Sequence, residues 1–217
     1  MFSCIRNFFY LCIEILSSAM RKEFNTTGSC NPNRHYMVDT SKRFKAVESM
    51  IDRGKYFTIN RARQYGKTTM LQTIRRRLSD KYLVIKTSFE GVGDEPFKEE
   101  ASFAKLFVNL MVNELAYYNE DEKFINVWKD KEIANLGSLS QAITRFCQMY
   151  PRPVIVLIDE VDKSSDNQLF LSFIGMLRDL YLKRDDRGMN VTFHSVVLAG
   201  VYDVKNLKLK IRPEAEK

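Results

Sequence analysis

The sequence predicts an α/β fold built as three layers around a mainly parallel β-sheet. Short β-rich runs alternate along the chain with longer segments of helical periodicity, which is the pattern of layered α/β folds. The run 154–158 is apolar at every position, as in a central strand buried on both faces. The sequence Gly66-Lys67-Thr68 follows a β-rich run and opens a helical pattern.

The first half of the chain is predicted to form two helices and two strands. Ser41 can cap a helix that runs to Arg53, where Gly54 ends it. The segment 24–36 is rich in Asn, Thr, Gly and Pro, so it is predicted to be a loop. The next elements are a strand at 56–60, a helix after Gly66 with Met70, Leu71, Ile74 and Leu78 on its apolar face, and a strand at 82–89.

The second half continues the alternation. Its predicted elements are a helical region at 102–128, a helix from Ser138 or Ser140 to Tyr150, a strand at 154–158, a helix at 169–182 and a strand at 191–198. Pro151 and Pro153 separate the second of these helices from the strand that follows. The sequence holds no internal repeat and no low-complexity segment.

The residues from Gly66 to Thr69 have the context of a phosphate-binding loop. A turn from a strand into a helix points backbone N–H groups at an anion, and the helix dipole adds to the attraction. In such a loop Lys67 reaches the β- and γ-phosphates and the hydroxyl of Thr68 binds magnesium. The usual pattern has a glycine where this sequence has Arg61, so the match is incomplete.

Asp159 and Glu160 form a second motif of the same predicted nucleotide site. Asp159 ends an apolar strand, the position expected for a carboxylate that holds magnesium, usually through water. Glu160 could orient and deprotonate the water that attacks the γ-phosphate. A helix cap or a loop carboxylate pair is the alternative. The two motifs together predict a P-loop fold that binds ATP and Mg²⁺.

The loop sequence YFTINRARQYGKTT resembles the phosphate-binding loop of the predicted AAA-ATPase-like family, which is related to STAND-type and archaeal ATPases. That family has Arg-Ala/Pro-Arg-Gln/Arg-Tyr/Phe-Gly-Lys-Ser/Thr, so Arg61 agrees with it. Similar stretches are KEFNTTGSCNPNRHYMVDTSKRF, VIVLIDEVDK and LAGVYDVKNLKLKIRP. The resemblance covers 20–217 and implies a nucleotide-binding loop made of Arg61, Ala62, Arg63, Gln64, Tyr65, Gly66, Lys67, Thr68 and Thr69.

Members of that family resemble AAA-type ATPases, and many carry a domain similar to PD-(D/E)XK nucleases after the ATPase. No such domain follows Asn206, so the resemblance implies an isolated or truncated ATPase module over 20–217. It also favours 1–19 as an extension outside the fold, with a signal peptide or a membrane anchor as alternatives. The uncharged stretch 7–13 is far shorter than the roughly 20 residues of a membrane span.

Composition limits the other classes of function. With 45% hydrophobic and 28% charged residues, the chain is predicted to be globular rather than disordered. Its scattered cysteines are expected to be free thiols of a cytoplasmic protein. Four scattered cysteines and two histidines argue against a zinc site. The net charge of +7 suits a polyanionic partner such as a nucleotide or a nucleic acid.

Several polar residues keep two interpretations. Arg61 and Arg63 could contact phosphates or a neighbouring subunit's nucleotide, or could be solvated loop residues. Asp162 could extend the acidic site or cap the next helix. The run Arg75 to Arg77 favours a solvated face over a nucleic-acid stripe, because a helix spreads neighbouring residues around its axis. Candidates for a γ-phosphate sensor are Thr192, His194 and Ser195.

Three functions agree with these patterns. The first is an ATPase whose hydrolysis drives or gates a conformational change. The second is a nucleotide-dependent switch or adaptor that binds ATP but hydrolyses little of it, with a second copy or a partner protein reading the nucleotide state. The third is a nucleic-acid-associated module.

Overall fold

A computed structural model describes residues 22–26, 30–62, 65–129, 133–161, 168–187 and 192–200. The chain divides into two compact units, 1–41 and 42–217. In the first unit the described residues from 24 to 36 form the predicted loop, with an isolated parallel bridge between Glu23 and His35. The N–H of Glu23 donates to the carbonyl of Arg34 at 3.0 Å, and the N–H of Tyr36 donates to the carbonyl of Glu23 at 3.0 Å.

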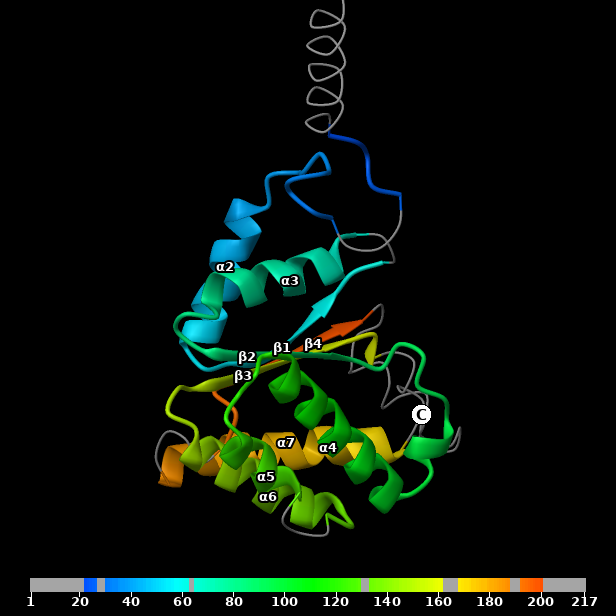
Figure 1. The fold of residues 1–217 in the computed structure, drawn as a ribbon, viewed down its shortest axis with the longest axis vertical. Helices are drawn as coiled ribbons and strands as arrows, with labels where there is room; N and C mark the ends of the chain where they lie inside the picture. The colour runs from blue at the N-terminus through cyan, green and yellow to red at the C-terminus, as the bar shows by residue number, and fades with distance from the viewer. Residues whose placement is uncertain are drawn as a thin grey trace, which may run out of the picture. The chain divides into compact units, whose positions relative to one another are not determined.

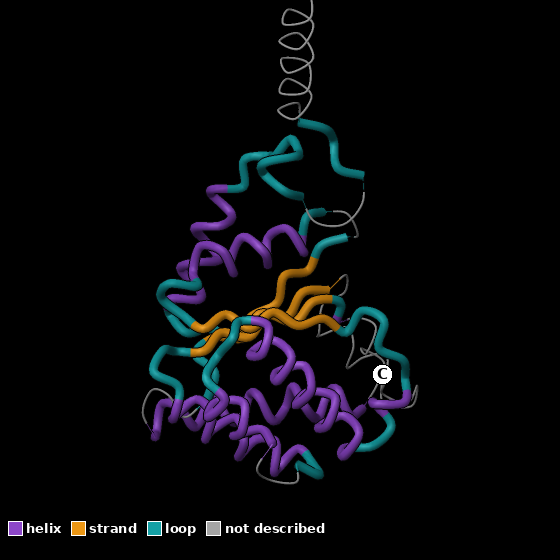
Figure 2. Tube along the Cα trace, viewed as in Figure 1, coloured by secondary structure: helices purple, strands orange, loops and turns teal. Residues whose placement is uncertain are grey.

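The second unit has the predicted three layers (Figures 1 and 2). Its all-parallel sheet has the strand order β1-β4-β3-β2, with β1 at Tyr56–Asn60, β2 at Leu83–Ser88, β3 at Val154–Asp159 and β4 at Ser195–Gly200. One face carries α2 (Ser41–Asp52) and α3 (Lys67–Leu78). The other face carries α4 (Glu100–Tyr117), α5 (Glu122–Lys129), α6 (Leu136–Met149) and α7 (Gln168–Arg187), and a short 3-10 helix at Glu95–Phe97 precedes α4.

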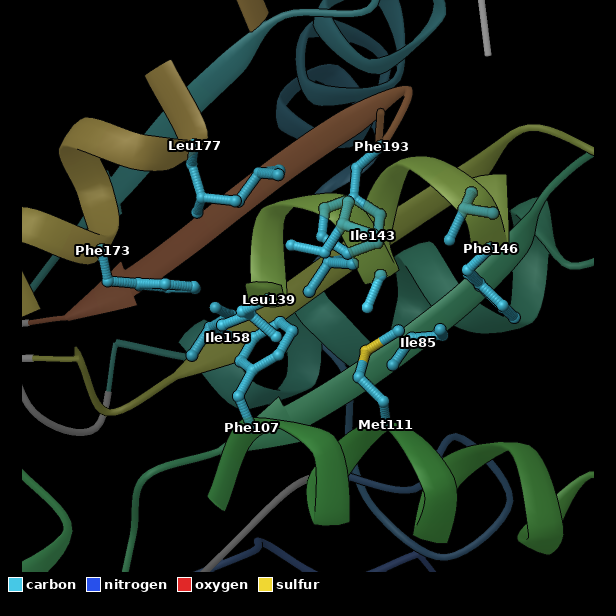
Figure 3. Close-up of a cluster of buried hydrophobic side chains, with 14 of the residues drawn as sticks. Ile85, Phe107, Met111, Leu139, Ile143, Phe146, Ile158, Phe173, Leu177 and Phe193 are labelled. Atoms are coloured by element: carbon cyan, nitrogen blue, oxygen red, sulfur yellow. The ribbon is translucent and has the colours of Figure 1, made fainter. Parts of the chain in front are cut away.

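Side chains that alternate along the strands divide the core into two clusters. Ile85, Val156 and Ile158 face the larger cluster, which α4 to α7 complete (Figure 3). Val84, Ile155 and Leu157 face the smaller cluster, under α2 and α3. Because successive side chains of a strand point to opposite faces, a strand covered on both sides must be apolar throughout. The apolar run at 154–158 was therefore correctly predicted to be a central strand.

The helical region predicted at 102–128 is two helices. Asn119, which has φ of 52°, separates α4 from α5. Asparagine tolerates this left-handed conformation better than most residues, and it commonly ends helices in this way. The carboxylate of Asp121 then accepts the N–H of Lys123 at 3.0 Å and begins the second helix. Helical periodicity continued across the break and concealed it.

Three further boundaries differ from the predictions. Asn135 caps α6 by accepting the N–H of Ser138 at 2.8 Å, so neither predicted serine is the cap. Ser138 instead returns the contact, since its Oγ accepts the N–H of Asn135 at 3.1 Å in a capping box. The last helix extends to Arg187, and the last strand begins at Ser195 rather than 191.

A buried arginine joins α7 to the turn between α2 and β1. Arg184 is 9% exposed and donates to the carbonyls of His194 at 2.8 Å and Gly54 at 2.9 Å. Gly54 has φ of 64°, and a Cβ placed there would lie 3.0 Å from the guanidinium of Arg184 and 3.2 Å from the carbonyl of His194. The glycine therefore meets both a backbone and a packing requirement.

We expect Gly54→Ala to lower the free energy of unfolding by about 2–3 kcal/mol, from left-handed strain and from one disturbed hydrogen bond. Gly91→Ala is the matched control, because Gly91 has φ of 76° but no atom within 4 Å of a Cβ. The control should cost only the strain, about 1–2 kcal/mol. Urea denaturation measures both values. Equal losses would show that the contact with Arg184 does not constrain this turn.

Candidate functional site

The loop between β1 and α3 is shaped by Gly66. This residue has φ of 74° and precedes the first residue of α3. A left-handed turn of this kind favours glycine, because other residues place Cβ against the backbone. The first helical hydrogen bond runs from the N–H of Met70 to the carbonyl of Gly66 at 2.9 Å. The N–H groups of Lys67 and Thr68 precede that ladder and face the loop side of the helix.

Lys67 lies beneath the loop and is only 6% exposed. Its Nζ donates to the carbonyl of Arg61 at 2.9 Å and to that of Ala62 at 3.3 Å. A buried ammonium group is costly unless polar groups surround it. No ion pair to Lys67 occurs among the described residues. The two loop carbonyls therefore supply the polar contacts of this buried ammonium group.

The hydroxyl of Thr68 joins the loop to the end of β3. It donates to Oδ2 of Asp159 at 2.8 Å, across 91 positions of sequence. Oδ1 of Asp159 accepts the N–H of Glu160 at 3.1 Å. Asp159 is 3% exposed, so the carboxylate is buried with both oxygens hydrogen-bonded. Three of the predicted site residues therefore lie in contact.

Glu160 has a strained backbone, with φ of 55°. A left-handed conformation costs a residue such as glutamate about 1–2 kcal/mol. Asn119, the other described non-glycine residue with positive φ, lies at a helix end, where that conformation is common. Strain of this kind is frequent where a side chain must be directed into a functional site. Glu160 is half-buried and directly follows the buried carboxylate of Asp159.

The sheet brings these residues together at the carboxyl ends of its strands. Strand β4 lies between β1 and β3, and Asn60 pairs in register with Gly200. The N–H of Arg61 donates to the carbonyl of Gly200 at 3.2 Å and extends the ladder into the loop. Because all four strands are parallel, their carboxyl ends lie on the same side of the sheet, which is where α/β folds commonly bind ligands. The loop after β1 and Asp159 at the end of β3 therefore lie at the same end of the sheet.

Two residues at the carboxyl ends of the strands were not predicted from the sequence. Gly200 provides the backbone contact to Arg61, and Ser88 pairs in register with Asp159 at the end of β2. The available signal for Gly200 was its place at the end of an apolar run, where a small residue admits a neighbouring loop. Ser88 carried no signal apart from its position after a predicted strand.

The rest of the loop is partly described. The side chains of Arg61 and Ala62 are exposed, and that of Tyr65 is 67% exposed. The carbonyl of Thr69 accepts the hydroxyl of Thr73 at 2.8 Å within α3. Arg63 and Gln64 lie outside the described residues, as does Asp162.

The three candidates for a γ-phosphate sensor lie at the opposite end of the sheet, where β4 begins. Ser195 begins β4 and donates its hydroxyl to the carbonyl of Lys55 at 2.6 Å. Thr192 and His194 precede the strand, where Thr192 contacts the hydroxyl of Tyr56 at 3.3 Å. Nε2 of His194 lies 2.9 Å from the carbonyl of Ile51, and burial lowers the pKa of this imidazole. None of these candidates contacts the loop between β1 and α3, because β4 runs away from them toward Gly200.

The three arginines of the run on α3 differ in their surroundings. Arg75 pairs with Glu114 at 3.0 Å and lies over the ring of Tyr118, 4.3 Å from its centroid. Arg77 lies 4.6 Å from the ring centroid of Phe44. The predicted solvated face holds for Arg76 and Arg77, which are exposed, but not for the half-buried Arg75, which packs on α4.

Comparison with known proteins gives one family match. A family model described as an AAA-like domain matches residues 26–204, which include the loop, Asp159 and all four strands. No curated protein matches the chain. In the described part of the chain, no helix is both long and apolar enough to cross a membrane.

Proposed function

Since the chain belongs to the AAA-like domain family and is a nucleotide-binding module of the ATPase type, we propose that it binds ATP with Mg²⁺ and couples hydrolysis to a conformational change. The contact between Thr68 and Asp159 is the observation that carries this proposal. It joins the loop that would hold phosphates to the carboxylate that would hold the metal. The proposed location is the cytoplasm.

The phosphates would lie on the loop from Arg61 to Thr69. The N–H groups at the start of α3 and the helix dipole favour negative charge there. Lys67 would move its ammonium group from the two loop carbonyls toward the β- and γ-phosphates. Charge-assisted hydrogen bonds to phosphate are stronger than those to neutral carbonyls, so ATP would compete effectively for this lysine.

The residues present fit a magnesium ion. Thr68 offers a hydroxyl and Asp159 a carboxylate, and the two oxygens are 2.8 Å apart. Mg²⁺ prefers oxygen ligands and usually combines one or two carboxylates with water and substrate phosphates. Among the described residues, no group of three or more metal-binding side chains occurs, which agrees with a site that phosphate would complete. The ion would neutralise charge on the phosphates, while Thr68 and Asp159 position it.

Glu160 would act as the general base. Glu160 directly follows Asp159 in the sequence, so its carboxylate could lie near the proposed metal position. A base there would accept a proton from water as that water attacks the γ-phosphate, and ADP and phosphate would be the products. The left-handed backbone at Glu160 would aim this side chain.

We expect Asp159→Asn to weaken ATP binding about 10- to 100-fold in Mg²⁺ and to leave binding in EDTA unchanged. The amide oxygen can still accept from Thr68, but the charge that attracts the metal is lost, and the NH2 group replaces the oxygen that accepts the N–H of Glu160. Isothermal titration with ATP in each buffer measures this difference. Asp80→Asn is the control, because Asp80 is exposed in the turn after α3. An Asp159→Asn protein with the same affinity as the wild type in Mg²⁺ would remove the metal assignment.

A switch or adaptor with little hydrolysis is the alternative within the same family. It would use the same ATP contacts and differ only in the rate of phosphate release. A second copy or a partner protein would then read the bound nucleotide. An association with nucleic acid through the arginine run alone has less support, because the carboxylate of Glu114 pairs with Arg75, the first arginine of the run.

A further inference from the structure

Basic residues are concentrated on the two helices that cover one face of the sheet (Figure 1). Helices α2 and α3 together contain seven basic and two acidic residues. Helices α4 to α7 on the other face are much longer in total, but they contain eight basic and six acidic residues. The positive net charge of the chain is therefore concentrated on α2 and α3.

Five of the seven basic side chains on α2 and α3 are exposed. The other two are engaged within the protein, because Lys67 is buried under the phosphate-binding loop and Arg75 pairs with Glu114. The exposed five form what we call the α2–α3 basic surface, which consists of Lys42, Arg43, Lys45, Arg76 and Arg77.

Arg77 brings the cations of the two helices together. Its guanidinium lies 4.6 Å from the ring centroid of Phe44, in a cation–π contact between the end of α3 and the beginning of α2. Phe44 stands between Arg43 and Lys45 in the sequence of α2. The positive charges of α3 are therefore held beside those of α2, on one surface.

Nearby carboxylates neutralise only part of this charge. Asp52 lies at the other end of α2 and pairs with Lys81 at 2.8 Å, which leaves Glu48 as the second acidic residue of the two helices. Asp39 precedes α2 and accepts the N–H of Ser41 at 2.9 Å. Asp80 follows α3. Five exposed cations thus remain in excess over the carboxylates around them.

The beginning of α2 is an unfavourable place for positive charge. Lys42 and Arg43 lie in its first turn, which contains no acidic residue. Because the dipole makes the start of a helix positive, cations there lower helix stability. A sequence that keeps an unfavourable local pattern at exposed positions commonly does so for function. Here the side chains and the dipole act together to attract an anion.

The same surface lacks side chains that two other classes of polyanion require. The exposed large hydrophobic residues of the described chain all lie outside α2 and α3. Single-stranded nucleic acid is bound largely by stacking its bases on aromatic side chains. An anionic membrane is bound by cations together with apolar side chains that enter it. The phosphate backbone of a duplex requires only cations.

We propose that the α2–α3 basic surface binds the phosphate backbone of double-stranded nucleic acid, independently of base sequence. Contacts to phosphate supply affinity and carry no direct sequence information. The arginine run does not form this site alone, since Arg75 is paired, and the three cations of α2 complete it. The site is distinct from the proposed ATP site, which lies at the first residues of α3 rather than at its last.

Fluorescence anisotropy with a labelled duplex of about 20 base pairs tests this proposal, at several salt concentrations and without nucleotide. The test variant combines Lys42→Gln, Arg43→Gln and Lys45→Gln. Glutamine is a good helix former, and removal of cations from the start of α2 should not destabilise the helix. The matched control combines Lys105→Gln, Lys129→Gln and Arg178→Gln, which lowers the net charge equally at exposed positions of α4, α5 and α7.

We expect the logarithm of the wild-type binding constant to fall against the logarithm of salt concentration with a slope of about −3 to −4.5, since each of three to five phosphate contacts contributes about 0.9. The α2 variant should bind at least about tenfold more weakly at about 0.1 M salt, with a slope smaller by about 2 to 3. The control should keep the wild-type slope. Arg76→Gln combined with Arg77→Gln should reduce the slope by about 1 to 2.

Equal losses in the α2 variant and its control would overturn the proposal, because binding would then follow net charge rather than this surface. It would also be overturned by a wild type that does not bind the duplex at low salt, by tighter binding of a single strand of the same sequence, or by binding to phosphatidylserine vesicles in place of the duplex. Thermal melting checks folding, and the variant of Arg76 and Arg77 supplies the test if the α2 variant is unfolded. Because no nucleotide is present, the result does not depend on the ATP proposal.

Discussion

Lys67→Ala is expected to weaken binding of Mg-ATP by more than about 100-fold, which is the loss of two charge-assisted hydrogen bonds to phosphate. The wild-type ammonium group is already positioned under the loop, 2.9 Å from the carbonyl of Arg61. An alanine at this position leaves the N–H groups of the helix start in place but removes the positive charge. Isothermal titration with Mg-ATP measures the change in affinity.

Two variants keep this experiment interpretable. Lys67→Met retains the apolar stem of the 6% exposed side chain, so it should fold even if the shorter alanine loosens the loop. Lys105→Ala removes an exposed lysine from α4 and should bind Mg-ATP like the wild type. Thermal melting confirms folding in each case. A folded Lys67→Met protein with wild-type affinity would disprove the phosphate-binding role of the loop.

Glu160→Gln is expected to slow ATP hydrolysis by about 10²- to 10⁴-fold, the usual contribution of a general base. Glutamine matches the size of glutamate and has the same difficulty with a φ of 55°, so backbone strain should not change. ATP affinity should stay equal or rise slightly, because Lys67, Thr68 and Asp159 remain. Single-turnover phosphate release measures the chemical step apart from product release.

Glu90→Gln is the matched control for this measurement. Glu90 is exposed and follows the carboxyl end of β2, and it is not one of the residues that hydrogen-bond the carboxylate of Asp159. Its variant should release phosphate at the wild-type rate. If the wild type binds Mg-ATP and releases phosphate no faster than Glu160→Gln, the ATPase proposal fails for this chain. The nucleotide-switch alternative then explains the same binding site.

Local patterns in the sequence were sufficient to predict most of the helices and strands and to select Lys67, Thr68, Asp159 and Glu160 as candidates for the site. An apolar run shows burial on both faces of a strand, as at 154–158, because each residue reports its own environment. The glycine before Lys67 and the carboxylate that ends β3 are likewise properties of short segments. The sequence predicted that Thr68 and Asp159 both bind magnesium, but it did not predict the hydrogen bond between them.

Tertiary structure decided what depends on distant residues. The order β1-β4-β3-β2 places Gly200 beside the loop and Ser195 at the other end of β4. No local pattern around 191–198 predicts this arrangement. The break at Asn119 depended on a single backbone conformation within continuous helical periodicity. The burial of Arg75 against Glu114 required α3 and α4 to meet at the β2 edge. Strand order and side-chain pairing are set by contacts between distant segments, so they emerge only when the chain is folded.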